Sequence, residues 1–430
     1  MSIMPYLNKN FWILRFSELA ALFGNQLALI AISFYVLNHG GHAIQISYIF
    51  MPAFIMGLVC SLVLAPLADQ CDRKHFIIIG SFFKSIAWLV IVFFIFTNKT
   101  SVFIFSGLFM LSGVGGAMIT AGSSGFLPDI VDNKQLQKAF QVITGTDSII
   151  KILGGSFAGT LVGFLGIPVA LCINFLAFLS AGCSVIFIKP FNSKKNLRLN
   201  QFSWTVITNA IKKWPRHFFQ GFSFMMQSRS LVVMVFALVV LQFIISPLQI
   251  ALPLFVKMHL KESSRFLGFL MSAEGVGAIL SSIMLGKMAT LFSKDAIITM
   301  GFVMTALGIL TFSLHLDKWI YLFSLTLASM GINLSSMIFN SALMSHIQGD
   351  YRSRFFTLLF FIENSMVPVS LILAGYLIDK WGVSRFFSLI GFLLLLVSLL
   401  FFYHRTFQGL QNISHELIPC ENEVLEFNSE

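Results

Sequence analysis

The chain has 430 residues, of which 57% are apolar and only 11% charged, and its mean hydropathy is +0.86. Soluble globular chains carry roughly 25% charged residues, so the composition excludes an ordinary soluble protein. A transmembrane helix needs about 20 mainly apolar residues, and the chain holds enough apolar residues for about twelve such helices. We therefore expect an all-α integral membrane protein that crosses the bilayer many times.

The charge balance and the cysteines exclude several other classes of protein. Lys and Arg number 28 against 18 Asp and Glu, which gives a net charge of +10. In a soluble protein this excess would suggest a nucleic-acid partner, but in a membrane protein it reports which loops face the cytoplasm. The five cysteines are scattered and predict neither a disulfide framework nor a zinc site. We expect no nucleic-acid partner, no metal and no cofactor.

Twelve apolar segments are long enough to cross a membrane, and they fall into two groups of six on either side of a polar stretch. The expected spans are residues 11–37, 46–67, 76–96, 102–121, 140–162, 169–188, 231–256, 266–288, 296–314, 319–344, 355–378 and 386–403. Helix is the expected element because these runs exceed the length of a barrel strand, which is about 9–11 residues.

These groups predict four regions along the chain. We expect an N-terminal six-helix bundle at 1–188, a basic amphipathic cytoplasmic connector at 189–230, a C-terminal six-helix bundle at 231–403 and an acidic cytoplasmic tail at 404–430. The connector mixes aromatic with basic side chains, which favours an interfacial helix on the inner leaflet over a disordered linker. The tail is rich in glutamate and is expected to be a solvated end.

The basic residues predict the orientation of the chain in the membrane. With the N-terminus inside, the inward segments hold 18 Lys and Arg, the outward loops hold seven, and three lie within spans. This asymmetry agrees with the positive-inside rule, although the connector alone supplies eight of the 18 inward residues. An even number of spans then places both termini in the cytoplasm.

The two groups of spans are related by an internal repeat. The loop after the second span, residues 65–74, matches the loop after the eighth span, residues 286–295, in a register of 221 positions. This register sets Ala68 on Ala289 and Arg73 on Lys294. Such a repeat is typical of secondary transporters built from two similar halves.

Three motifs resemble those of the major facilitator superfamily. The loop after the second span resembles the superfamily signature through Leu67, Ala68, Asp69, Arg73 and Lys74, although Ala65, Gln70 and Asp72 depart from it. Residues 127–139 resemble the Leu-Pro-Asp-x-Val segment before the fifth span of the enterobactin-exporter and macrolide-efflux group, and 375–382 resemble that group's Gly-x-x-x-Asp-x-x-Gly run. The resemblance implies twelve transmembrane helices in two pseudo-symmetric six-helix bundles.

The same resemblance implies a secondary active transporter, not an enzyme, in the bacterial inner membrane. We expect a monomer that exports a small organic molecule, a siderophore or an amphipathic drug, by proton antiport with alternating access, with membrane lipid as its surroundings. No nucleotide-binding loop of the Gly-x-x-x-x-Gly-Lys-Ser/Thr type is present, so the proton gradient is the expected energy source. The alternatives are a lysophospholipid flippase of the same fold, a polytopic membrane enzyme, and a sensor that transports nothing.

Charged residues at the cytoplasmic loops are candidates for a conformational gate. In the superfamily the loop after the second span is thought to govern alternation between inward-open and outward-open states. We expect Asp69 to face the positive end of a neighbouring helix. We expect Arg73 to pair with Asp129 or Asp132 at the inner end of the fourth span. The full candidate set is Asp69, Arg73, Lys74, Asp129 and Asp132. The alternative is that these are ordinary loop charges.

Ionisable residues inside spans are costly and therefore point to function. The proton-coupling candidates are Glu274, Glu363, Asp147, Lys151 and Glu18. Glu274 and Glu363 have no cation at helical spacing and are preferred. Asp147 and Lys151 are four residues apart, so a local ion pair is an equally good interpretation. Arg15 and Glu18 are expected to form a gate or an interface contact, and Lys84 completes the group of in-span charges.

Amide side chains near span centres are candidates for the substrate cavity. The resemblance implies that the first, fourth, seventh and tenth spans line it, and all the candidates except Asn364, in the eleventh span, lie in three of these four. The candidates are Asn25, Gln26, Gln242, Gln249, Asn333, Asn340 and Asn364. Hydrogen bonding between helices is the alternative for each of them. The glycines Gly155, Gly159 and Gly163, each four residues apart, predict close packing of the fifth span on another helix.

Overall fold

A computed structural model describes residues 7–68, 72–98, 101–132, 135–188, 222–223, 225–226, 229–346 and 349–403. Within these ranges all regular structure is helical, and twelve helical segments are long and apolar enough to cross a membrane. The predicted twelve-span helical fold is confirmed. Most of the predicted connector and the whole of the predicted tail, residues 404–430, lie outside the described residues.

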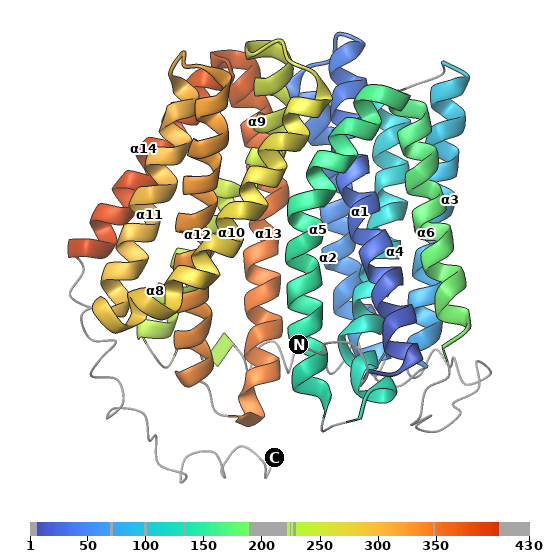
Figure 1. Cartoon of the computed structure of the whole chain (residues 1–430), viewed down its shortest axis with the longest axis horizontal. Coiled ribbons are helices and arrows are strands. Elements are labelled where there is room, and N and C mark those ends of the chain that lie inside the picture. Colours follow the sequence, from blue (N-terminus) through green and yellow to red (C-terminus); the bar gives the residue numbers. More distant parts are fainter. Residues whose placement is uncertain are drawn as a thin grey trace.

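The helices form two groups of six spans that stand side by side in Figure 1. The N-terminal half consists of α1 (Lys9–Asn38), α2 (Ala43–Ala68), α3 (Arg73–Phe96), α4 (Val102–Ile130), α5 (Leu136–Leu165) and α6 (Ile167–Ile186). The C-terminal half consists of α8 (Arg229–Ile245), α9 (Leu248–Leu254), η3 (Phe255–His259), α10 (Ser264–Leu291), α11 (Lys294–Leu310), η4 (Thr311–Ser313), α12 (Lys318–His346), α13 (Gly349–Trp381) and α14 (Val383–Tyr403).

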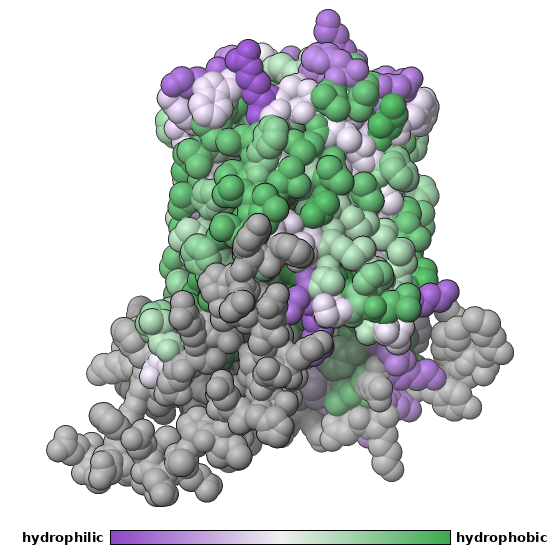
Figure 2. Space-filling view, turned by 90° about the vertical axis from the view of Figure 1, so that its left-hand side faces the viewer, coloured by the Kyte–Doolittle hydropathy of each residue, from purple (hydrophilic) through white to green (hydrophobic). Residues whose placement is uncertain are grey.

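The molecule has two polar faces separated by an apolar belt. We call the face at which α1 begins the terminal face, on the lower side of Figure 1, and the face at which α1 ends the distal face. Figure 2 shows a broad hydrophobic band beneath a hydrophilic rim at the distal face. A band of this kind matches the hydrocarbon core of a bilayer, where backbone groups must be satisfied within each helix.

Polar side chains set where several of these helices begin. The side chain of Asn8 accepts a hydrogen bond from the Phe11 amide at the start of α1, and Asp72 does the same for the Lys74 amide at the start of α3. Ser293 caps α11 in the same way. Such caps satisfy amide groups that have no partner within the helix. They place helix starts at the membrane surface, where the apolar runs begin.

The seventh span is broken, although the sequence pattern predicted one helix over 231–256. It consists of α8, a turn at Ser246 and Pro247, the short α9, and the π-helical η3. Proline has no amide hydrogen and disrupts a helix interior, and Pro253 lies inside α9. The Ser246 hydroxyl lies 2.6 Å from the Ser370 hydroxyl of α13, which holds the turn in place.

An aromatic cluster anchors the distal end of this span. The ring of Phe255 lies 5.1 Å from that of Phe312, 5.0 Å from that of Tyr321 and 5.4 Å from that of Phe387, all in edge-on contacts. All four side chains are buried. Aromatic pairs in this arrangement stabilise a packed core beyond the area that they bury, so the distal end of the seventh span is fixed to its own half.

One contact between the halves is a seam of small residues between α5 and α10. Ser264 donates a hydrogen bond to the Gly159 carbonyl over 3.1 Å, and the hydroxyls of Ser156 and Ser272 lie 2.6 Å apart. A Cβ atom added at Gly159 would lie 2.8 Å from the Gly268 Cα atom, which leaves no room for a side chain. The close packing predicted from the glycine spacing is confirmed.

A second contact between the halves joins the distal ends of α2 and α13. The Asp379 carboxylate accepts hydrogen bonds from the Ala43 amide at 2.9 Å and the Ile44 amide at 3.0 Å, at the first residues of α2. The Ser47 hydroxyl donates to the Leu371 carbonyl over 2.7 Å. A carboxylate at a helix N-terminus is favoured by the unpaired amides and the helix dipole. A side chain of one half thus caps a helix of the other.

Candidate functional site

A cavity of about 200 Å³ lies in the C-terminal half and reaches α1 of the N-terminal half. Its wall is mainly aliphatic, and it carries three side chains that the sequence singled out, Gln242, Gln249 and Glu274. Leu29 of α1 is also part of this wall. A mostly apolar pocket with a few polar groups is the usual form of a small-molecule site.

The break in the seventh span brings the two glutamines to this cavity. Gln242 lies one turn before the break and Gln249 lies just after it. Because Pro253 has no amide hydrogen, the Gln249 carbonyl lacks the donor that a regular helix would supply. Discontinuous helices of this kind form the substrate sites of several transporter folds, so the broken span suits a polar binding wall.

Glu274 is the ionisable residue of the cavity wall, and its side chain is exposed there. Within the described residues no cation lies within ion-pair distance of its carboxylate. Lys151 of α5 interacts with Glu274 electrostatically across the seam between the halves. A carboxylate without a bonded cation in a largely apolar wall can either hold a proton or bind a cationic group.

The remaining predicted amides do not line the cavity. Asn333 donates to the Ser329 carbonyl over 2.8 Å, Asn340 to the Ser336 carbonyl over 2.9 Å, and Asn364 to the Phe360 carbonyl over 2.8 Å. Each bond reaches back one turn along the same helix. Ser329 is itself a lining residue, so Asn333 adjoins the cavity wall.

Two predicted amides on α1 have other neighbours. The Asn25 side chain accepts a hydrogen bond from Lys84 over 3.1 Å. Gln26 packs beside Gly154 of α5, where a Cβ atom on that glycine would lie 3.9 Å from the Gln26 Cγ atom. The predicted amides thus fall into three groups. Two line the cavity, three bond to the backbone of their own helix, and two contact residues of the N-terminal half.

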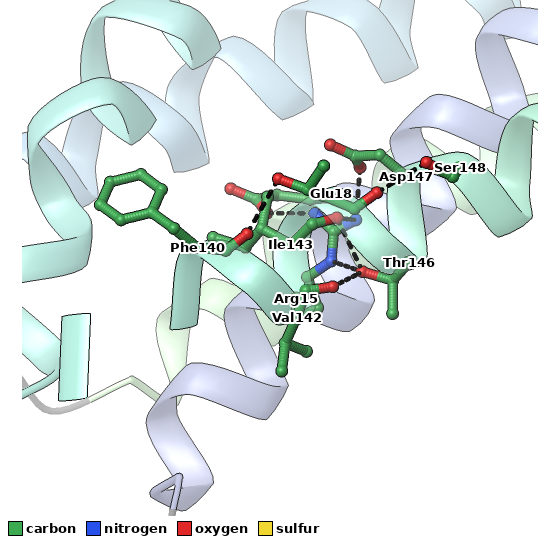
Figure 3. Close-up of polar contacts among 9 residues, drawn as sticks. Arg15, Glu18, Phe140, Val142, Ile143, Thr146, Asp147 and Ser148 are labelled. Atoms are coloured by element: carbon green, nitrogen blue, oxygen red, sulfur yellow. Dashed lines mark hydrogen bonds and ion pairs between the residues drawn. The ribbon is translucent and has the colours of Figure 1, made fainter. Parts of the chain in front are cut away.

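A second candidate site is a charge cluster between α1 and α5, shown in Figure 3. The Arg15 side chain is only 2% exposed. Its guanidinium donates to the Thr146 hydroxyl over 2.7 Å, to the Glu18 carboxylate over 2.8 Å and to the Ile143 carbonyl over 3.2 Å, and it also pairs with Asp147. Two carboxylates therefore share one cation.

This cluster corrects the interpretation of Asp147 and Lys151 as a local ion pair. Among the described residues Asp147 pairs with Arg15, and no ion pair joins it to Lys151. The planar guanidinium from α1 binds several acceptors at once, whereas Lys151 is exposed and makes no ion pair among the described residues. Arg15 makes the expected interface contact with α5, and Glu18 binds Arg15 within α1. A role of Glu18 or Asp147 in proton transfer stays a prediction.

Glu363, the other preferred proton candidate, lies half-buried on α13. It does not line the cavity. No hydrogen bond or ion pair joins its carboxylate to another residue in the part of the chain that the structure describes. Its role stays a prediction.

The terminal face carries the predicted gate residues. Arg73 lies 3.6 Å from the Asp129 carboxylate, so one of the two predicted pairings is present. Lys74 instead donates to the carbonyls of Ile186 and Ile188 at the end of α6, over 2.8 Å each. Asp132 is exposed, and Asp69 lies outside the described residues. The gating role of this group stays a prediction.

Two residues gained significance only from the structure. Asp379 lies in the 375–382 run that carried a family resemblance, and that motif was the one signal that could have pointed to it. Its contact with α2 spans more than 330 residues of sequence and could not be read from local spacing. Lys84 was an in-span charge without an assigned role, and its neighbours come from three other helices.

Twelve spans in two halves, a cavity at their boundary and a broken seventh span define a secondary transporter of the major facilitator type. The chain belongs to the family described as transmembrane secretion effector, which matches residues 1–424. This membership excludes the membrane-enzyme alternative and makes the chain a multi-pass membrane protein of an efflux family.

Relatives in this family include efflux proteins. The chain is 20% identical over 398 residues to macrolide efflux protein A of Streptococcus pyogenes, which covers 91% of this chain and 96% of that protein. It is 19% identical over 388 residues to the MFS-type transporter YvqJ of Bacillus subtilis (strain 168), with 89% of each chain covered.

Solved structures share the fold at low sequence identity. The nucleoside transporter NupG aligns with a TM-score of 0.69 at 12% identity, over 92% of this chain and 98% of that chain. A bacterial homologue of the iron transporter ferroportin in the inward-facing state aligns with a TM-score of 0.66 at 13% identity, over 93% of this chain and all of that one. These similarities concern the fold alone.

Proposed function

We propose that the protein exports a small amphipathic organic molecule, a drug or a siderophore, across the bacterial inner membrane by proton antiport. The observation that carries this proposal is Glu274, a carboxylate that has no ion-pair partner among the described residues and lies in a mainly aliphatic cavity wall with Gln242 and Gln249. Apolar side chains suit the body of an amphipathic molecule, and the amides can orient its polar groups. The name of the macrolide efflux relative supports export as the direction.

Proton coupling follows from the chemistry of one carboxylate. A carboxylate in a largely apolar wall is most stable when it is protonated or paired with a cation. Binding of a basic substrate group and binding of a proton at Glu274 therefore exclude each other. Exchange of one for the other on opposite sides of the membrane gives antiport, with the terminal face in the cytoplasm.

Alternating access fits the contacts between the halves. The α5–α10 seam and the Asp379 contact both involve the distal parts of their helices. To release a substrate at the distal face, the halves must separate there and close at the terminal face, where Arg73 and Asp129 lie. A rocking motion of two bundles around a central site has this consequence.

The test is transport in liposomes of a fluorescent amphipathic cation, a xanthylium dye methyl ester. We expect a pH gradient to drive its movement in the wild type, and Glu274→Gln to reduce gradient-driven transport at least tenfold because the amide cannot carry a proton. Glu262→Gln is the matched control, since Glu262 pairs with Lys318 over 2.6 Å and does not line the cavity. Glu363→Gln tests the second candidate.

Two results would contradict the proposal. Transport that is equal with and without the pH gradient excludes proton antiport and favours the flippase alternative, which needs no proton. Gradient-driven transport that survives both Glu274→Gln and Glu363→Gln excludes these carboxylates as the proton carriers.

A further inference from the structure

Lys84 is a cation in the middle of α3 with no acidic partner among the described residues. Its ammonium group donates to the Asn25 side chain over 3.1 Å and lies 4.5 Å from the centre of the Phe178 ring. Within the described ranges no carboxylate lies within ion-pair distance of it. A lysine ammonium has three donors, so two of them have no acceptor in this part of the chain.

The neighbouring helix leaves room for this lysine. Gly115 and Gly116 of α4 lie along its side chain, and a Cβ atom at Gly115 would lie 2.8 Å from the Lys84 Cγ atom. A Cβ atom at Gly116 would lie 3.9 Å from the ammonium nitrogen. The two glycines let the side chain pass α4 and reach α1.

The acceptor of the ammonium group lies on α1 close to a residue that lines the cavity. Asn25, its acceptor, is exposed and lies one helical turn before Leu29, which lines the cavity. Residues four apart on a helix share one face. The Lys84–Asn25 pair therefore lies on the face of α1 that carries a cavity-lining residue, on the N-terminal side of the site.

A second polar group nearby also has unused bonding capacity. Asn174 of α6 is fully buried, and both polar atoms of its amide lack a hydrogen-bond partner among the described residues. A Cβ atom at Gly24 would lie 2.4 Å from the Asn174 oxygen and 3.2 Å from the Phe178 ring, so Asn174 borders the same contact between α1 and α6. Unsatisfied buried amides are rare and costly.

An unpaired charge inside a membrane span is costly and usually marks a substrate or ion path. We propose that Lys84 and Asn25 form a subsite for an anionic group, a carboxylate, on the transported molecule. This inference rests on the proposed function, because it places the subsite beside the cavity that holds Glu274. It extends the substrate class to amphipathic molecules that carry a carboxylate.

The test is equilibrium binding to the purified full-length protein, measured by fluorescence polarisation and needing no gradient. The probes are a xanthylium dye with a free carboxylate and its methyl ester, which differ only at the acidic group. We expect Lys84→Met to weaken binding of the free acid about tenfold and to leave binding of the ester within about twofold, whereas Lys84→Arg keeps the preference for the acid. Lys287→Met, an exposed lysine outside the cavity, is the matched control.

Three results would contradict the proposed subsite. An equal loss for both dyes in Lys84→Met, with Lys84→Arg unchanged from the wild type, assigns Lys84 a structural role and overturns the subsite. A wild type that binds the ester but not the acid also overturns it, and the proposed function stands. Binding of neither dye by the wild type contradicts both the subsite and the amphipathic substrate class.

Discussion

At the scale of single residues, the Arg15 cluster brings three charged groups together at the contact between α1 and α5. One buried guanidinium serves two carboxylates that are 26% and 36% exposed, Glu18 and Asp147. The three groups together carry one net negative charge when all are ionised. One carboxylate can therefore take up a proton while the other keeps its ion pair, and this makes the cluster a second place where a proton could be held.

Replacement of Arg15 should be the most damaging change in this cluster. We expect Arg15→Met to lower the free energy of unfolding by about 3 kcal/mol, because two carboxylates lose their cation at once. Glu18→Gln should cost about 1 kcal/mol or less, since Asp147 and Thr146 still hold the guanidinium. Thermal unfolding of the purified protein in detergent measures both. If the two variants unfold alike, the cluster does not stabilise the α1–α5 contact.

At the scale of elements, two of the contacts between the halves are built from different chemistry. The α5–α10 seam consists of glycines, serines and backbone atoms, with hydrogen bonds between uncharged groups. The distal α2–α13 contact depends on one carboxylate over a helix N-terminus. Close backbone packing resists separation, whereas an exposed carboxylate can exchange its amide partners for water. The second seam is therefore the easier one to open.

A methyl group in the α5–α10 seam should force the halves apart. We expect Gly159→Ala to destabilise the protein by about 2–3 kcal/mol, because the new Cβ atom would lie 2.5 Å from the Ser264 carbonyl oxygen. Gly145→Ala on the same helix is the control, since nothing lies within 4 Å of its added Cβ atom. It should be neutral or slightly stabilising. Equal unfolding temperatures for both variants would show that α5 and α10 are not in contact here.

Loss of Asp379 should make the distal end of α2 more accessible. In a cysteine-free background, a cysteine at the buried Ser47 position reports opening through its reaction with a membrane-impermeant maleimide. We expect Asp379→Ala to raise the labelling rate about fivefold, which corresponds to about 1 kcal/mol for two partly exposed charge-assisted hydrogen bonds. Asp317→Ala is the control, because Asp317 caps the Trp319 amide within its own half. A similar rise in this control would exclude a specific role for Asp379.

At the scale of the whole molecule, both ends of the helical part lie at the terminal face, as the even number of spans requires. The positive-inside rule predicts that this face lies in the cytoplasm. In intact cells, a cysteine at Asn38 should react with an impermeant maleimide, and one at Lys294 should react only after lysis. Both positions are exposed, at the distal and terminal faces respectively. The reverse labelling pattern would invert the predicted orientation.

The sequence predicted the number of spans because hydropathy follows directly from the requirement to bury apolar residues in lipid. It also identified Gln242, Gln249 and Glu274, since polar residues in apolar runs stand out. The pairing of Asp147 with Lys151 was wrong because a spacing of four residues detects only neighbours on the same helix. The observed partner, Arg15, lies on a different helix. The hydropathy pattern does not predict the break at Pro247, because the residues on both sides of it are mainly apolar.

The broken seventh span bears on how large a cargo the cavity can admit. Its distal segment is fixed by the aromatic contacts of Phe255, whereas Pro247 and Pro253 remove two backbone hydrogen bonds that would otherwise stiffen the span. We expect α8 to tilt at Ser246 while α9 stays in place. The width of the cavity near Gln242 then adjusts to bulkier molecules, while the end near Gln249 keeps its shape. The end near Gln249 therefore selects the shape of the bound group, and the end near Gln242 determines how large the rest of the molecule can be.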